Sequence, residues 1–75
     1  MTTLAMWTVY EKPKDYPDHF VARRFEVDAE GPKPTASVII CDDLERLREV
    51  LAFEMHLVRL FRMDGDEPHI VESWL

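Results

Sequence analysis

The sequence is poor in the residues from which small domains build disulfide or metal staples. It has one cysteine, Cys41, so no disulfide can form within the chain. No close pair of metal-ligand type, such as CxxC or HxxxH, includes Cys41 or any of the three histidines. A lone cysteine is typical of a reducing compartment. We therefore expect a cytoplasmic protein that binds neither a metal nor a cofactor.

Other absences narrow the function. With only two glycines, the chain has no glycine-rich phosphate loop, and it contains neither GxSxG nor HExxH. It has no run of about 20 apolar residues that could span a membrane, and no charged-then-apolar leader opens it. An enzyme stays an open alternative, but a non-enzymatic protein is favoured because no catalytic constellation is recognisable.

Charge argues against nucleic acid as a partner. Fifteen acidic residues stand against nine Lys and Arg, which gives a formal net charge of −6. A phosphate backbone repels a chain of that sign unless its basic residues gather on one face. The candidates for such a basic patch, if their strands lie side by side, are Arg23, Arg24, Arg59 and Arg62.

The 75 residues predict a single domain, residues 1–75. Segments rich in β-branched and aromatic residues predict strands. These segments are residues 4–10, 19–27, 35–41, 56–62 and 69–75. Pro13 and Pro17 make residues 10–19 a stiff connection, residues 28–34 have the composition of a loop, and Gly65 predicts a hairpin turn within 63–68.

One helix is predicted between the third and fourth strands. Asp42 is expected to cap it, with Glu45 completing a capping box. The apolar stripe consists of Leu44, Leu47, Val50 and Leu51. The helix is expected to end near Phe53 or Met55, and residues 52–57 either extend it or begin a strand. The order β-β-β-α-β-β predicts an α+β fold: a small, mostly antiparallel sheet of four or five strands with the helix on one face.

Apolar residues occupy both alternating sets of several strands. In residues 19–27 the more apolar set is assigned to the core: Val21, Arg23, Phe25 and Val27. The other set is Phe20, Ala22, Arg24 and Glu26. Because one short helix covers only one face of a sheet, the second face is expected to meet a protein partner or a second copy of the chain. Alternatively, long basic side chains and the proline connection cover it.

Aromatic and cationic residues of the kind enriched in protein-binding hot spots lie near the connection. The candidate partner-binding residues are Tyr10, Tyr16, His19, Arg23, Arg24 and Arg59. The leading hypothesis is a protein-binding or self-associating module that is not an enzyme. The alternative is a small ligand-binding domain or enzyme acting on an anionic metabolite that one of the arginines holds. Cys41 ends an apolar run and is interpreted as a buried small residue rather than a nucleophile.

Two motifs suggest kinship. Near the start, the pattern Y-x-x-P-x-D-Y-P followed by F-V-x-R comprises Tyr10, Pro13, Asp15, Tyr16, Pro17, Phe20, Val21 and Arg23. Near the end, D-x-P-x-I-V-E-x-W comprises Asp66, Pro68, Ile70, Val71, Glu72 and Trp74. With these motifs the chain resembles a group of short bacterial and phage-type proteins of unknown function. The resemblance implies no activity.

Overall fold

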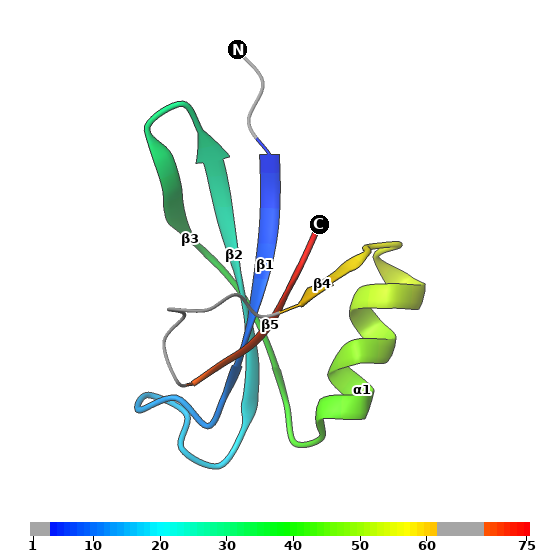
Figure 1. Ribbon diagram of the computed structural model, residues 1–75. Helices are drawn as coiled ribbons and strands as arrows, with labels where there is room; N and C mark the ends of the chain where they lie inside the picture. Colours follow the sequence, from blue (N-terminus) through cyan, green and yellow to red (C-terminus); the bar gives the residue numbers. More distant parts are fainter. Residues whose placement is uncertain (1–3, 62–68) are drawn as a thin grey trace.

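The computed structural model describes residues 4–61 and 69–75, and these form one sheet with one helix (Figure 1). The strands are β1 (Leu4–Glu11), β2 (Phe20–Asp28), β3 (Gly31–Cys41), β4 (Arg59–Phe61) and β5 (Ile70–Trp74). The helix consists of α1 (Leu44–Glu49) and a π-helical turn, η1 (Val50–Glu54). The spatial order of the strands is β3-β2-β1-β5-β4, and all neighbours are antiparallel. The predicted fold class is confirmed.

The first strand is the centre of the sheet, because the last strand pairs with it. β1 pairs with β2 along its whole length, from Leu4 opposite Val27 to Glu11 opposite Phe20. On its other side β1 pairs with β5, with Trp7 opposite Trp74. The C-terminal hairpin of β4 and β5 is thereby joined to the N-terminal strand. The predicted turn at 63–68 lies outside the described residues.

The predicted loop at 28–34 is wrong, because two strands occupy most of it. β2 runs to Asp28 and β3 begins at Gly31, whose φ of 109° suits glycine in a tight turn. The Asp28 carboxylate accepts a hydrogen bond from the Glu30 backbone N–H at 2.8 Å, which closes the turn. Pro32 and Pro34 suggested a loop, but an edge strand tolerates prolines because one side of its ladder has no partner.

The helix begins one residue later than predicted. Asp43 caps it, its side chain accepting from the Glu45 N–H at 3.1 Å, while Asp42 lies 2.9 Å from the His19 ring. The helix continues to Glu54, so residues 52–54 extend it. His56, at a positive φ of 55°, follows, and β4 begins only at Arg59. The predicted strand at 56–62 is therefore wrong for residues 56–58 and confirmed for Arg59–Phe61.

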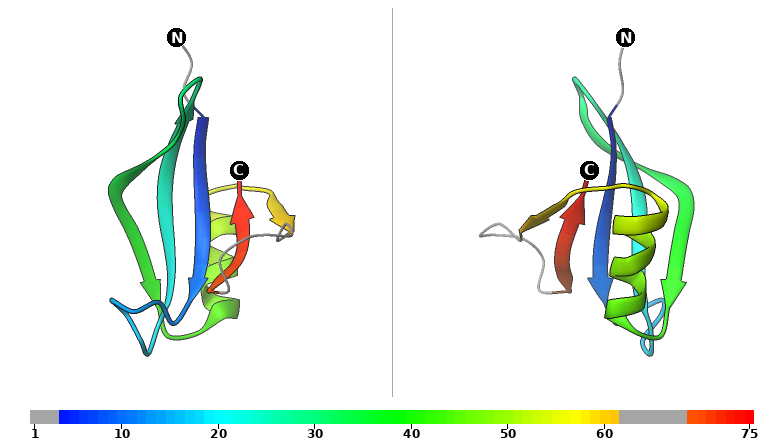
Figure 2. Two further views of the ribbon diagram at one scale, coloured as in Figure 1. Left: turned by 60° about the vertical axis from the view of Figure 1, so that its left-hand side comes forward. Right: turned by 90° about the vertical axis from the view of Figure 1, so that its right-hand side faces the viewer.

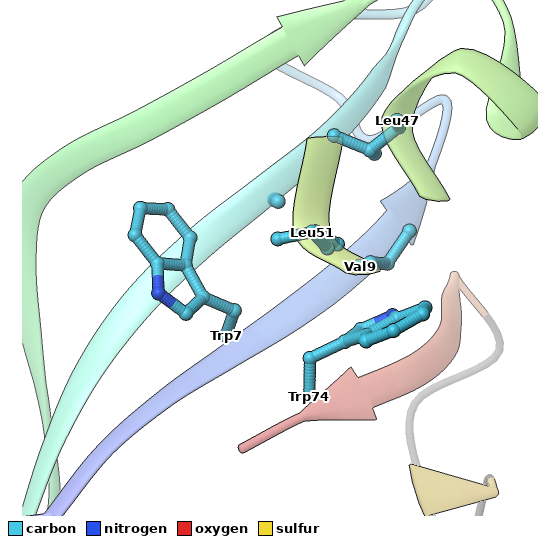
Figure 3. Close-up of a cluster of buried hydrophobic side chains, with 6 residues drawn as sticks. Trp7, Val9, Leu47, Leu51 and Trp74 are labelled. Carbon is cyan, nitrogen blue, oxygen red and sulfur yellow. The ribbon is translucent and has the colours of Figure 1, made fainter. Parts of the chain in front are cut away.

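The core lies between α1 and the centre of the sheet (Figure 3). It consists of Trp7, Val9, Ala22, Leu47, Leu51 and Trp74, none more than 7% exposed. The side chain of Ala22 is small, so Leu47 and Leu51 can approach the sheet closely. The set of β2 residues assigned to the core from the sequence began with Val21 and Arg23. Val21 is indeed fully buried, but the helix packs on the other set, through Ala22, so the assignment of the core to the first set is wrong.

The two faces of the sheet are therefore distinct. We call the side that contacts α1 the helix face and the opposite side the open face. The connection predicted at 10–19 comprises residues 12–19, between β1 and β2. In the left view of Figure 2, α1 and this connection leave the lower end of the sheet on opposite sides. In the right view, α1 stands in front of β1 and β2, and the β2–β3 hairpin projects beyond it.

Candidate functional site

The projecting end of the sheet presents apolar side chains on the open face. Residues directly opposite one another on paired strands share a face. The strand pairings place Leu4, Val27 and Pro32 in one such row. They place Met6, Phe25 and Pro34 in a second row. We call these six residues the apolar ledge. Leu4 is 52% exposed, the prolines are exposed and the remaining three residues are half-buried.

The opposite side of the same strands is polar. The row between the two apolar rows consists of Ala5, Glu26 and Lys33, on the helix face. The Lys33 ammonium lies 3.2 Å from the Asp28 carboxylate and 2.8 Å from that of Glu30, and these hydrogen bonds raise the pKa of Lys33. The end of the sheet beyond α1 is thus amphipathic, with charge on one side and the ledge on the other.

The other end of the open face is covered by the chain itself. Val21 is fully buried there and Thr8 is 5% exposed. From the connection, the Asp15 carboxylate accepts a hydrogen bond from Arg23, and Pro13 is buried. We infer that the connection lies over this end of the face. The predicted alternative, cover by the proline connection, therefore holds over β1 and β2 at this end, whereas Ile40 of β3, opposite Val21, is 42% exposed. It does not hold at the ledge.

The connection is fixed by backbone hydrogen bonds as well as by the ion pair. The Lys12 N–H donates to the His19 carbonyl at 3.0 Å, and the Tyr16 N–H donates to the Pro13 carbonyl at 3.0 Å. The His19 N–H donates in turn to the Tyr16 carbonyl at 3.2 Å. The stiffness predicted from the two prolines therefore has a hydrogen-bonded basis.

The structure brings only some of the predicted binding residues together. Arg23 lies over the Tyr10 ring, 5.9 Å from its centroid, on the open face. Tyr16 is half-buried within the connection, and His19 lies at the start of β2, paired with Asp42. These residues hold the connection in place or lie at the ends of strands. They lie at the opposite end of the sheet from the ledge.

Arg24 and Arg59 lie on the helix face, away from Arg23. Pairing places Arg59 opposite Trp74, Trp74 opposite Trp7, and Trp7 opposite Arg24. β2 and β4 are separated by β1 and β5, so the proposed basic patch does not form among the described arginines. Its fourth candidate, Arg62, lies outside the described residues.

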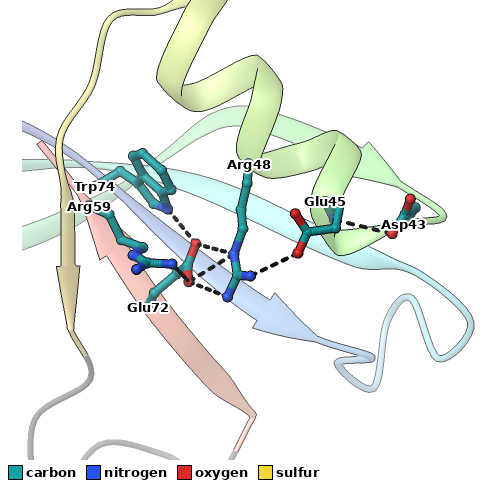
Figure 4. A network of polar contacts seen from close by, with 6 residues as sticks. All are labelled: Asp43, Glu45, Arg48, Arg59, Glu72 and Trp74. Carbon is teal, nitrogen blue, oxygen red and sulfur yellow. Dashed lines mark hydrogen bonds and ion pairs between the residues drawn. The ribbon is translucent and has the colours of Figure 1, made fainter.

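A polar network on the helix face was not predicted (Figure 4). Glu72 is 4% exposed and accepts hydrogen bonds from Arg48, at 2.9 Å from Nη2, and from the Trp74 indole at 2.8 Å. The hydrogen bond to Glu72 raises the pKa of Arg48, and Arg59 approaches the same carboxylate at 4.0 Å. The network joins α1 to β5. No spacing pattern in the sequence predicts this network, because Arg48 and Glu72 belong to different elements.

Both edges of the sheet are poorly suited to pairing with another strand. At one edge, the described part of β4 has three residues. At the other, β3 has prolines at 32 and 34, and its register with β2 shifts between Arg23 and Phe25. Thr35 fixes this bulge by donating to the Arg24 carbonyl at 2.9 Å. Short edges, prolines and bulges are the features by which proteins block edge-to-edge association.

Cys41 is half-buried and packs against the core. Burial raises the pKa of its thiol, and Asp42 and Asp43 raise it further, whereas Arg46 lowers it. These effects favour the thiol over the reactive thiolate at neutral pH. The arrangement agrees with the interpretation of Cys41 as a small core residue.

Across residues 4–61 and 69–75 we find no pocket and no group of three side chains arranged to hold a metal ion. No helix in this part of the chain has the length and apolar character needed to cross a membrane. No protein-family model, curated protein or solved structure matches the chain. The resemblance to short bacterial and phage-type proteins therefore stays a prediction.

Proposed function

We propose that the chain is a protein-interaction module that is not an enzyme, and that it binds its partner through the apolar ledge. The carrying observation is the ledge itself: six apolar side chains in two rows, on a part of the sheet that neither α1 nor the connection covers. Exposed apolar surface with a polar surround is a mark of interaction sites.

The position of the ledge supports this role. It lies at the end of β1, β2 and β3 that projects beyond α1 (Figure 1), so an approaching surface meets no obstruction from the helix. Leu4, Pro32 and Pro34 belong to rigid or paired backbone, so ordering them on binding costs little entropy.

An anionic metabolite as ligand is less well supported. Arg23 is paired with Asp15, and Arg24 lies 3.4 Å from Glu26. Arg48 and Arg59 both approach Glu72. An anion held by any of these arginines would have to displace a carboxylate of the chain.

The test is affinity capture from the native cell with three baits. These are the unchanged chain, a Leu4→Lys/Val27→Lys variant and a Phe53→Lys variant. Phe53 is 75% exposed on η1, so its replacement is a matched apolar-to-lysine change away from the ledge. We expect the unchanged chain and Phe53→Lys to retain a shared protein that the ledge variant loses.

Folding of each bait is checked first by the fluorescence of Trp7 and Trp74, both buried. If a folded ledge variant retains the same protein as the unchanged chain, the ledge is not the binding surface and the proposal is wrong. If thermal-shift screening instead finds a stabilising anionic metabolite, the alternative of a ligand-binding domain replaces it.

A further inference from the structure

Resting on the proposed function, we propose a specific occupant for the ledge: the ledge of a second copy, related by a two-fold axis. Each copy of the chain carries the same apolar surface, and a two-fold contact uses it twice. The two copies would meet face to face across Leu4, Phe25 and Val27, with their α1 helices on the outer sides of the pair.

The distribution of charge favours this contact. Among the described strand residues, every acidic side chain lies on the helix face: Glu11, Glu26, Asp28 and Glu72. The single charged strand residue on the open face, within the same described ranges, is Arg23, and it is neutralised by Asp15. Two copies of a chain with a net charge of −6 can therefore approach through their open faces without bringing strand carboxylates together.

The edges and the connection determine which part of the face can meet. The prolines and bulge of β3, and the three described residues of β4, disfavour association by extension of the sheet. The connection occupies the end of the open face that holds Val21 and Arg23. Ledge-on-ledge contact keeps the two connections at the outer ends of the pair, where they do not collide.

The size of the ledge determines the strength expected. Standard stable interfaces involve roughly 20–30 residues from each partner. The ledge supplies six side chains, two of them prolines. The dimer is therefore weak, and it forms and dissociates as concentration changes.

Sedimentation velocity of the purified chain, from about 10 μM to about 1 mM, measures this equilibrium by mass action. We expect the weight-average mass to rise from the monomer value of 8.9 kDa toward twice that value. The Leu4→Lys/Val27→Lys variant is expected to stay monomeric throughout, while Phe53→Lys and Val58→Lys behave like the unchanged chain. Val58 is 68% exposed and, like Phe53, lies outside the ledge.

Backbone amide shifts recorded over the same dilution series locate the contact without any substitution. Concentration-dependent shifts are expected at Met6, Phe25 and Val27 and not in α1. A strict monomer at all concentrations, or shifts confined to the β3 edge at residues 38–41, would overturn the ledge dimer.

The two proposals fail separately. A purified chain that stays monomeric, while the ledge variant still loses a cellular partner, refutes self-association and leaves the protein-interaction module standing. Association of the purified chain that persists in the Leu4→Lys/Val27→Lys variant refutes the ledge dimer, and the partner site is then decided by the capture experiment alone.

Discussion

The two faces of the sheet are built from the same strands but are protected in different ways. On the helix face, Leu47 of α1 and Leu51 of η1 pack in one cluster with Val9 and Ala22, and all four are fully buried. On the open face, the connection covers one end, whereas at the other end Leu4 remains 52% exposed. One short helix is sufficient for the middle of one face. A loop can shelter only part of the other.

The difference separates stability from interaction. Free energy from apolar burial is proportional to the area removed from water, at roughly 25 cal/mol per Å². The cluster of buried core residues lies on the helix face. Replacements there should affect folding, whereas replacements on the ledge should affect association and leave folding nearly unchanged.

The largest effect is expected from Leu51→Ala, which removes a fully buried side chain of η1 from the core cluster. Cavity formation typically costs about 2–5 kcal/mol, which in so small a domain is a large part of the total stability. Urea unfolding followed by tryptophan fluorescence measures the loss. Leu4→Ala is the matched control on the open face and should cost less than about 1 kcal/mol. Equal losses at the two positions would show that the faces do not differ as described.

The next effect is expected from Glu72→Gln. The amide keeps the shape but loses the charge that Arg48 and the Trp74 indole contact, so we expect a loss of about 1–3 kcal/mol in the free energy of unfolding. Glu49→Gln is the control: Glu49 forms an exposed pair with Arg46 and should matter by about 0.5 kcal/mol or less. If the Glu72 variant were as stable as the control, the network would not contribute to holding α1 against β5.

The sequence predicted the order of elements well, because each strand segment has a local signature. The alternation of residues within β2 was less informative. Val21 and Ala22 are both fully buried, one on each face, so counting apolar residues could not tell which set meets the helix. Which set meets the helix depends on the side of the sheet on which α1 follows β3, and the alternation within β2 does not contain that information.

The candidate site in the structure consists of other residues than the sequence singled out. Arg23 and Tyr10 do lie together, yet Arg23 is paired with Asp15 of the same chain, so this arginine holds the connection in place. The ledge escaped prediction because Pro32 and Pro34 were assigned to a loop. Only the pairing of β3 with β2 brings these prolines beside Phe25 and Val27.

A smaller effect is expected where the connection covers the open face. Asp15→Asn removes the charge that holds Arg23, and because Asp15 is 54% exposed, solvent screening limits the cost to about 0.2–1 kcal/mol. The local consequence should be easier to see: amide hydrogen exchange at Tyr16 and His19 should speed up more than exchange in α1. Asp18→Asn in the same connection is the control. Uniform acceleration across the molecule would mean that the ion pair supports the whole fold rather than the cover.

The smallest perturbation compares one thiol on each face. Cys41 lies on the helix face, and its neighbour Ile40, 42% exposed, lies on the open face. Burial and the adjacent aspartates raise the pKa of Cys41, and the thiolate is the reactive form. Alkylation of Cys41 at neutral pH should therefore be several-fold slower than alkylation of the thiol in an Ile40→Cys variant that also carries Cys41→Ser. The pH–rate profile of Cys41 should also lie at higher pH. The unfolded chain ionises this thiol first, so the thiol's contribution to stability is complete below its ordinary pKa and declines as pH rises through the raised value. Equal alkylation rates at the two positions would mean that the helix face protects Cys41 no better than the open face protects a thiol at position 40.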